Sequence, residues 1–333
     1  MNRLSAALLT TALAVTSLSA ASGLAAAADP EKITVAYFRE WPTANQVAQA
    51  EQWYDKELGV PLEWRAYNTG VEMADAMVAG EVDISYSMGV VPFALAVTAG
   101  APIKVVGMAV DTGGADNCVI YKKEAIDRAN AHELEGRKVA VPLNTVTHYK
   151  MLRSLVFLGV DVERLDVVDM SPHDIDDAFI GGDLAMGCSW GGPLRRMKGH
   201  GWELLSANEQ DRLGIRAFDV IAVTNEFAEE HPDLVVKFLA VTDRAIDYLD
   251  DEPEQARPII AKAAELDLKA SDIVLSLFDF YTRDDQLTER WMGGGIQTFL
   301  KEVADFFEQQ GQIEKALDDY SATVDASFYE RVE

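Results

Sequence analysis

The sequence is poor in basic residues, and this shortage excludes several classes of partner. It holds 29 lysines and arginines against 55 aspartates and glutamates, which gives a net charge of −26. A chain this acidic repels nucleic acid and anionic membrane surfaces, so we expect neither as a partner. The same charge repels any anionic ligand. An anion would therefore have to be held by local dipoles rather than by the overall field.

Histidine and cysteine are also scarce. The five histidines are scattered along the chain, and none has a metal-ligand spacing to a cysteine, so we expect no metal and no cofactor. Cys118 and Cys188 could form a disulfide in an oxidising compartment or remain two buried thiols. Both stand between apolar or small neighbours, which suits buried thiols. The prediction is mainly free thiols.

Long hydrophobic runs are absent except at the start of the chain. Residues 1–28 carry one early Arg3, a small and apolar run from Leu4, and an alanine-rich end before Asp29. This pattern is typical of a secretory signal peptide cleaved near Ala28. A membrane helix is the alternative, but threonines and serines interrupt the run. Because no cysteine stands at the cleavage region, we expect no lipid anchor. The expected mature protein is free in the periplasm, is a monomer and does not insert into the membrane.

After residue 28, short β-branched runs alternate with helical stretches. This alternation predicts an α/β fold with mostly parallel sheets covered by helices on both faces. Strands are predicted at 33–38, 62–67, 82–85, 103–110, 118–121, 138–141, 165–168, 184–188 and 218–223, and helices at 45–58, 71–79, 92–99, 147–158, 174–180, 232–249, 254–266, 270–277 and 295–309. The length is sufficient for two lobes, each with its own core.

One unit occurs twice in the sequence. A helix ended by glycine, a short strand and a new helix at proline run from Gly80 to Pro92 and again from Gly182 to Pro193. Chance similarity of common βα turns is the alternative. Two related lobes are the simpler explanation, with lobe 1 at 29–114, lobe 2 at 115–217 and a return to lobe 1 at 218–333. Crossovers are then expected at 112–117 and 215–219, with the ligand in the cleft between the lobes.

Four loops stand where strands end and helices begin: 39–42, 68–70, 88–91 and 144–148. Helix starts present unpaired N–H groups with partial positive charge, so a small anion could bind there without arginine or lysine. Simple helix capping is the alternative for Thr145 and Thr147. Most aromatic residues should be core, but Trp41 and Trp190 stand in turns beside proline or glycine and are expected to face the cleft.

The stretch "VPLNTVTHY" gathers hydroxyls, an imidazole and a phenol before His148 and Tyr149. A nucleophile with its base is one interpretation, but no acid is visible to orient His148. The residues 186–190, "MGCSW", do not form the G-x-S-x-G motif of a nucleophile elbow. We therefore expect a wall of a binding site and no enzyme.

Longer stretches of the chain resemble a known family. They are "GEVDISYSMGVVPFALAVTAGAPIKVV", "ELEGRKVAVPLNTVTHYKMLRSLVFLGV", "SPHDIDDAFIGGDLAMGCSWGGPL" and "FDVIAVTNEFAEEHPDLVVKFL". Together they resemble the taurine-binding proteins of ABC importers, within the group that binds aliphatic sulfonates, nitrate and thiamine precursors. The resemblance runs from about residue 33 to residue 329. It implies a two-lobed type II periplasmic binding protein that closes by a hinge over a small zwitterionic ligand and delivers it to an inner-membrane ABC permease.

The resemblance also implies a set of ligand-binding residues. Backbone N–H groups at Gly89 and Val90 would hold a sulfonate, and Asp219 would face the ligand amine. The remaining implied contacts are Thr145, Thr147 and His148 opposite the sulfonate, Trp190 as the cleft tryptophan and Glu40 as the acid of the first turn. The chain departs from the taurine branch in two ways. It has Val90 and Val91 where that branch has hydroxyl residues, and its "WGGP" turn is one residue longer.

Two other functions remain open at this point. Trp41, Tyr149 and Trp190 could form cation–π faces for a quaternary amine of choline or betaine type, beside Asp219 or Glu40. An enzyme related to the pyrimidine synthases of the same group is the other possibility. The signal peptide argues against the enzyme, because in the relatives that chemistry is cytoplasmic.

Overall fold

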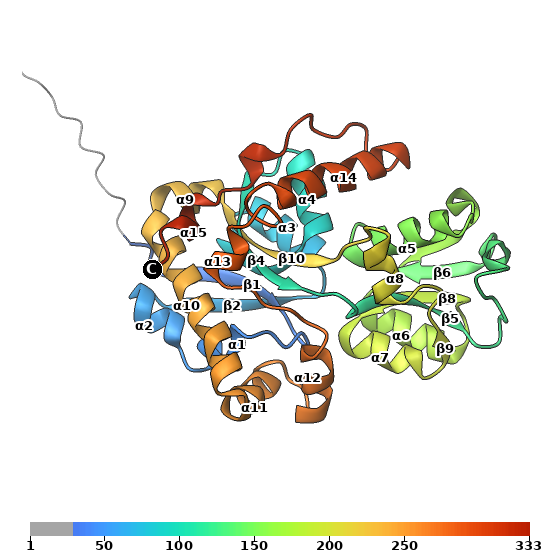
Figure 1. Ribbon diagram of the computed structural model, residues 1–333, viewed down its shortest axis with the longest axis horizontal. Coiled ribbons are helices and arrows are strands. Elements are labelled where there is room, and N and C mark those ends of the chain that lie inside the picture. Colours follow the sequence, from blue (N-terminus) through green and yellow to red (C-terminus); the bar gives the residue numbers. More distant parts are fainter. Residues whose placement is uncertain (1–28) are drawn as a thin grey trace, which may run out of the picture.

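The computed structural model describes residues 29–333, so the signal peptide predicted at 1–28 lies outside the described residues. Two helix-flanked sheets of five strands each form two lobes, which lie side by side along the long axis of the molecule (Figure 1). Within residues 29–333, no helix has the length and apolar character that crossing a membrane requires.

The sheet of lobe 1 has the order β2-β1-β3-β10-β4. β1 pairs in parallel with β2 and β3, whereas β10 runs antiparallel to both β3 and β4. β3 and most of β10 are buried, because helices cover both faces of the sheet. The strands are β1 (Ile33–Phe38), β2 (Leu62–Tyr67), β3 (Ile84–Gly89), β4 (Ile103–Asp111) and β10 (Phe218–Thr224).

The sheet of lobe 2 repeats this arrangement in the order β7-β6-β8-β5-β9. β6 is parallel to β7 and β8, and β5 is antiparallel to β8 and β9. Both sheets are therefore mixed rather than mostly parallel. The reason is that β5 and β10 enter their sheets directly from the other lobe. They begin at the cleft, where the parallel strands end. The strands are β5 (Asp116–Tyr121), β6 (Lys138–Val141), β7 (Asp166–Asp169), β8 (Met186–Trp190) and β9 (Gly201–Trp202).

The helix predicted at 45–58 is broken in two. Gln52 adopts the left-handed conformation (φ 56°) between α1 and α2, a local break that the apolar pattern does not reveal. The helices are α1 (Gln46–Ala50), α2 (Trp53–Leu58), α3 (Gly70–Val78), α4 (Val90–Thr98), α5 (Val146–Phe157), α6 (Pro172–Gly181), α7 (Gly191–Lys198), α8 (Ala207–Arg212), α9 (Asn225–Glu230), α10 (Pro232–Asp251), α11 (Pro253–Ala263), α12 (Leu268–Leu275), α13 (Arg283–Gln286), α14 (Gly295–Gln309) and α15 (Ser327–Glu330). Short 3₁₀ turns are η1 (Ala131–Leu134), η2 (Val162–Arg164) and η3 (Ser321–Thr323).

The C-terminal helices return to lobe 1, and α14 also reaches lobe 2. In Figure 1, α10 and α11 lie beside α1 and α2, while α14 runs along α4 toward α5. Tyr149 of α5 packs against Phe299, Phe306 and Phe307 of α14, with ring centroids 5.5–6.4 Å apart. Aromatic packing therefore joins the two lobes on this side of the cleft.

The chain passes between the sheets at residues 112–115 and again at 213–217. The two crossovers are bonded to each other, because the N–H of Thr112 donates to the carbonyl of Ala217 at 3.1 Å.

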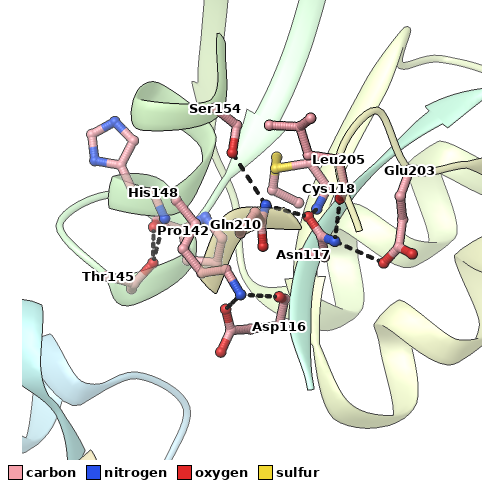
Figure 2. Close-up of a disulfide and its surroundings, with 12 residues drawn as sticks. Asp116, Asn117, Cys118, Pro142, Thr145, His148, Ser154, Glu203, Leu205 and Gln210 are labelled. Carbon is pink, nitrogen blue, oxygen red and sulfur yellow. Dashed lines mark hydrogen bonds and ion pairs between the residues drawn. A yellow bond between two sulfur atoms is a disulfide. The ribbon is translucent and has the colours of Figure 1, made fainter. Parts of the chain in front are cut away.

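The prediction of free thiols is wrong. Cys118 of β5 and Cys188 of β8 form a disulfide (Figure 2). The two residues stand directly opposite each other in the antiparallel β5–β8 register, with their Cα atoms 3.9 Å apart. Apolar sequence neighbours indicate burial of each cysteine, but they carry no information on the register that brings the two together.

Candidate functional site

A cavity of about 40 Å³ lies between the lobes. Since a single water needs roughly 10–15 Å³ of such space, the cavity admits only a small ligand. Both lobes contribute to its wall, which contains Phe38, Trp41, Gly70, Gly89, Pro92, Asp116, Thr145, Val146, Thr147, Trp190 and Asp219.

Four helices begin at this cavity. α3 starts at Gly70, α4 follows Gly89, α5 follows Thr145 and α7 follows Trp190. Thr69 and Thr145 each cap one N–H in the first turns of α3 and α5, and the Gly191 N–H of α7 donates to the Ala115 carbonyl. The other first-turn N–H groups have no partner within their own helices and lie at the positive ends of the helix dipoles. None of the residues that line the cavity is lysine or arginine. The site can therefore hold a small anion by backbone groups alone.

Close packing favours glycine at two of these helix starts. A Cβ atom on Gly70 would come within 2.6 Å of the Pro92 Cγ atom. A Cβ atom on Gly89 would lie 3.0 Å from the Val146 Cγ2 atom, across the cleft in lobe 2. The absence of side chains here lets the starts of α3, α4 and α5 approach one another.

Asp219 is the second residue of β10 and stands beside Gly89 in the β3–β10 register. Its side chain is only 5% exposed. Ser87 Oγ donates to Asp219 Oδ2 at 2.6 Å, and Trp41 Nε1 donates to the same oxygen at 3.2 Å. Burial raises the pKa of Asp219 to about 8, which these two hydrogen bonds only partly oppose. Asp219 is thus a desolvated carboxyl group in a cavity wall without a cationic side chain.

Ser87 owes its position to an unusual backbone conformation. Its φ of 81° lies in the left-handed region, which few residues other than glycine adopt. Strained backbone of this kind is concentrated at binding sites. Here it accompanies the hydroxyl contact to Asp219 and leaves the indole N–H of Trp41 shared between Ser87 and Asp219.

The two threonines at the start of α5 differ in what they offer a ligand. Thr145 Oγ1 donates to the carbonyl of Pro142 at 2.6 Å and accepts from the His148 N–H at 3.3 Å, so capping occupies this hydroxyl (Figure 2). Thr147 lines the cavity, is 1% exposed and has no hydrogen-bond partner for its Oγ1 atom. Its buried hydroxyl is therefore free to bond a ligand.

His148 and Tyr149 do not line the cavity. His148 Nδ1 accepts from the Asn144 N–H at 3.2 Å, and its ring lies against Phe307. Burial lowers the pKa of His148 to about 4, so the imidazole is neutral at physiological pH. Tyr149 faces α14, as described above.

Glu40 and Val90 also lie outside the cavity wall. Glu40 lines a larger space of about 430 Å³ at the cleft mouth, which shares Phe38 and Trp190 with the cavity. Val90 is fully buried in the first turn of α4. The structure thus brings together Trp41, Gly89, Thr145, Thr147, Trp190 and Asp219 from the predicted set, and leaves Glu40, Val90, His148 and Tyr149 outside the cavity.

Asp116 also lines the cavity and is not among the site residues predicted from the sequence. One signal could have identified it. Asp116 is the first residue of β5 and Asp219 is the second residue of β10, so each acid stands where a strand enters its sheet from the other lobe.

Comparison with known proteins places the chain in a family. Residues 43–256 match the family described as NMT1/THI5 like. The taurine-binding periplasmic protein of Escherichia coli K12 is 28% identical over 94% of this chain and 97% of its own length. A putative aliphatic sulfonates-binding protein of Bacillus subtilis is 23% identical over 82% of this chain and 80% of its own length.

Solved structures give the same fold. The alkanesulfonate-binding protein SsuA from Xanthomonas axonopodis pv. citri, bound to MOPS, superposes with a TM-score of 0.73 at 18% identity. The match covers 90% of this chain and 99% of that one. SsuA from Escherichia coli gives a TM-score of 0.70 at 20% identity, over 87% of this chain and 91% of its own. The chain belongs to the NMT1/THI5-like family and has the two-lobed fold of its periplasmic binding proteins.

Proposed function

We propose that this protein is the substrate-binding component of an ABC importer and captures a small sulfonate that bears an amine, taurine being the first candidate. The names of its relatives support the class of ligand and the periplasmic location. The cavity supports the finer assignment, because it is small and is lined by both lobes. A ligand that contacts both lobes stabilises the closed form, with the crossovers at 112–115 and 213–217 as the hinge.

The observation that carries this proposal is the pairing of opposite features in one small cavity. Four helix starts without a basic residue favour an anionic group, and the buried carboxyl of Asp219 favours a cation. A zwitterion satisfies both at once. An amine-free sulfonate would leave Asp219 protonated and would forgo the ion pair that an ammonium forms with the carboxylate.

The two alternative functions, catalysis and the binding of a quaternary amine, have less support. His148 accepts a backbone N–H through Nδ1 and packs against Phe307, so it is not positioned as a base for Thr147. Tyr149 packs against α14 and supplies no aromatic face to the cavity. Trp41 and Trp190 remain there, but Trp41 directs its indole N–H at Ser87 and Asp219.

Calorimetry with three ligands tests the proposal. Taurine should bind more tightly than ethanesulfonate, which lacks the amine, and more tightly than β-alanine, which has a carboxylate in place of the sulfonate. Asp219→Asn should weaken taurine binding by about 2–5 kcal/mol, because the ligand ammonium loses its charged partner. Ethanesulfonate binding should be unchanged or improved. The melting temperature of the free variant should not fall.

Asp243→Asn is the matched control. Asp243 is another buried lobe 1 carboxyl with a raised pKa, about 6 as a result of burial, but it accepts from Tyr329 and does not line the cavity. This variant should lower the melting temperature and leave taurine affinity unchanged. Taurine affinity within about threefold of the parent in Asp219→Asn would remove Asp219 from the site and, with it, the amine-bearing class of ligand.

A further inference from the structure

We propose that Asp116 is a second ligand-contacting carboxylate, so that the ligand ammonium binds between one carboxylate from each lobe, Asp219 of lobe 1 and Asp116 of lobe 2. This inference rests on the proposed function and deepens it. Both residues line the cavity, and both are almost fully buried, at 5% and 4% exposure. Glu40, the acid that the family resemblance implies, lies at the cleft mouth instead.

Asp116 is held rigidly in place. Thr112 Oγ1 donates to Asp116 Oδ2 at 2.9 Å, and Lys150 Nζ lies 2.9 Å from Asp116 Oδ1. Figure 2 shows Asp116 at the start of its strand, close to the beginning of α5 with Thr145 and His148. A carboxylate oxygen accepts more than one hydrogen bond, so these contacts leave acceptor capacity for a ligand N–H.

Lys150 cannot itself serve as the anion-binding residue of the site. It is 1% exposed, and its ammonium also donates to the backbone carbonyls of Asp116 at 2.7 Å and Gly113 at 3.2 Å. Backbone carbonyls thus take two of its three N–H donors, and the ammonium forms an ion pair with Asp116 Oδ1, an oxygen that accepts no hydrogen bond. Lys150 therefore neutralises one of the two cavity carboxylates and leaves a net charge of −1 when Asp219 is ionised, which a single ammonium matches.

Two further observations point to a ligand between the acids. The negative charge of Asp116 contributes to the raised pKa of Asp219, so the two carboxyl groups are electrostatically coupled. Thr147 supplies a buried hydroxyl without a partner in the wall of the same cavity. Asp116 and Asp219 belong to different lobes, so an ammonium bound to both would hold the lobes together.

The ratio of taurine affinity to ethanesulfonate affinity tests the inference. Asp116→Asn alone leaves Lys150 buried without its partner and could fail to fold, so the main variant combines Asp116→Asn with Lys150→Met and removes the pair together. We expect taurine affinity to fall roughly tenfold or more, with ethanesulfonate affinity within about threefold of the parent. Lys150→Met alone keeps the Asp116 carboxylate but leaves it buried without its counter-ion, so this variant should be less stable and still prefer taurine.

If the double variant keeps the parent's ratio of taurine affinity to ethanesulfonate affinity, the inference is overturned. Equal loss of affinity for both ligands would then show that Asp116 has a purely structural role. If the double variant does not fold, a crystal structure of the parent protein with taurine decides, because the ammonium must lie within hydrogen-bond distance of an Asp116 carboxylate oxygen. If the parent binds β-alanine but no sulfonate, the proposed function fails, and the inference is decided by the same comparison of β-alanine with propionate. Binding of none of these compounds overturns both.

Discussion

Asp219 and Asp116 occupy equivalent places in the two lobes, but their surroundings differ. Each is buried near the start of a strand that enters from the opposite lobe. Asp219 receives neutral donors only, from Ser87 and Trp41, whereas Asp116 is paired with Lys150. Asp219 has no cationic partner in the protein and can pair with a ligand cation. Asp116 already has Lys150 as its partner, so it also stabilises the fold. Removal of the carboxylate should therefore affect affinity in lobe 1 and both affinity and stability in lobe 2.

The largest expected effect is a difference in stability between two variants, in which Asp116 or Asp219 is replaced with asparagine. Asp116→Asn should lower the free energy of unfolding by about 3–5 kcal/mol, because Lys150 stays buried without its counter-ion. Asp219→Asn should leave the free energy of unfolding unchanged or raise it at neutral pH, because it removes a desolvated acid that has no cation. Urea denaturation of the ligand-free variants measures both changes.

Lys150→Met in the Asp116→Asn background is the control for this comparison. It removes the uncompensated charge and should recover most of the lost stability. A loss below about 1 kcal/mol in Asp116→Asn would contradict the contrast between the two acids, since it would mean that water or a rearranged side chain compensates Lys150.

The second prediction is that the parent protein and Asp219→Asn differ in how their stability changes with pH. The folded-state pKa of Asp219, raised to about 8 by burial, lies above the ordinary aspartate value of 3.8. Asp219 therefore contributes fully to the free energy of unfolding below about pH 4, and this contribution is lost as pH rises through about 8. The parent should therefore lose about 2–4 kcal/mol relative to Asp219→Asn between pH 5 and pH 8. Other carboxyls with raised pKa values, such as Asp243, are present in both proteins and cancel.

Taurine binding should show the opposite pH trend. A ligand ammonium favours the ionised form of Asp219, so binding below pH 8 should release a proton and strengthen as pH rises. Calorimetry in buffers of different ionisation enthalpy measures that proton. Proton release that persists in Asp219→Asn would assign it to another group.

The third prediction concerns the disulfide, which cross-links the sheet of lobe 2 only. Cys118 and Cys188 are 70 residues apart, and the pair are the only cysteines in the sequence. Replacing both with alanine should lower the free energy of unfolding by about 2–4 kcal/mol, because the unfolded chain becomes less restricted. Taurine affinity should change little, since neither cysteine lines the cavity. Thiol titration of the unfolded, unreduced parent should find no free thiol, and two free thiols would contradict the disulfide.

The local patterns of the sequence were enough to predict much of the fold. The ranges 33–38, 62–67, 138–141 and 295–309 match β1, β2, β6 and α14 at both ends, because each is a short periodic or apolar run with clear boundaries. The turns at Gly89 and Trp190 also lie at the cavity as expected. These features depend on neighbours in the chain.

The missed features depend on contacts between distant segments. The cysteine pairing requires the β5–β8 register. The crossover predicted at 112–117 includes Asp116, but the burial of its side chain in the cavity wall, on which its proposed role rests, depends on packing between the lobes. Tyr149 is itself a predicted site residue and stands two positions after Thr147, but a helix turns by about 100° per residue, so Tyr149 faces α14 while Thr147 lines the cavity. Without the position of α14, the sequence does not show which face of α5 lines the cavity and which packs against another helix.

The smallest expected effect comes from that same helix and separates the lobe interface from the ligand cavity. Tyr149→Phe keeps the aromatic ring that packs between Phe299, Phe306 and Phe307, so taurine affinity should stay within about threefold of the parent. Tyr149→Ala removes the ring, weakens the contact of α5 with α14 and should shift the ligand-free protein toward the open form, which small-angle scattering detects. Taurine affinity should then fall modestly, because the ligand must also restore the lost packing between lobes. If Tyr149→Phe instead weakened binding tenfold or more, the phenol would be a ligand contact, and the aromatic cleft for a quaternary amine would regain its third face.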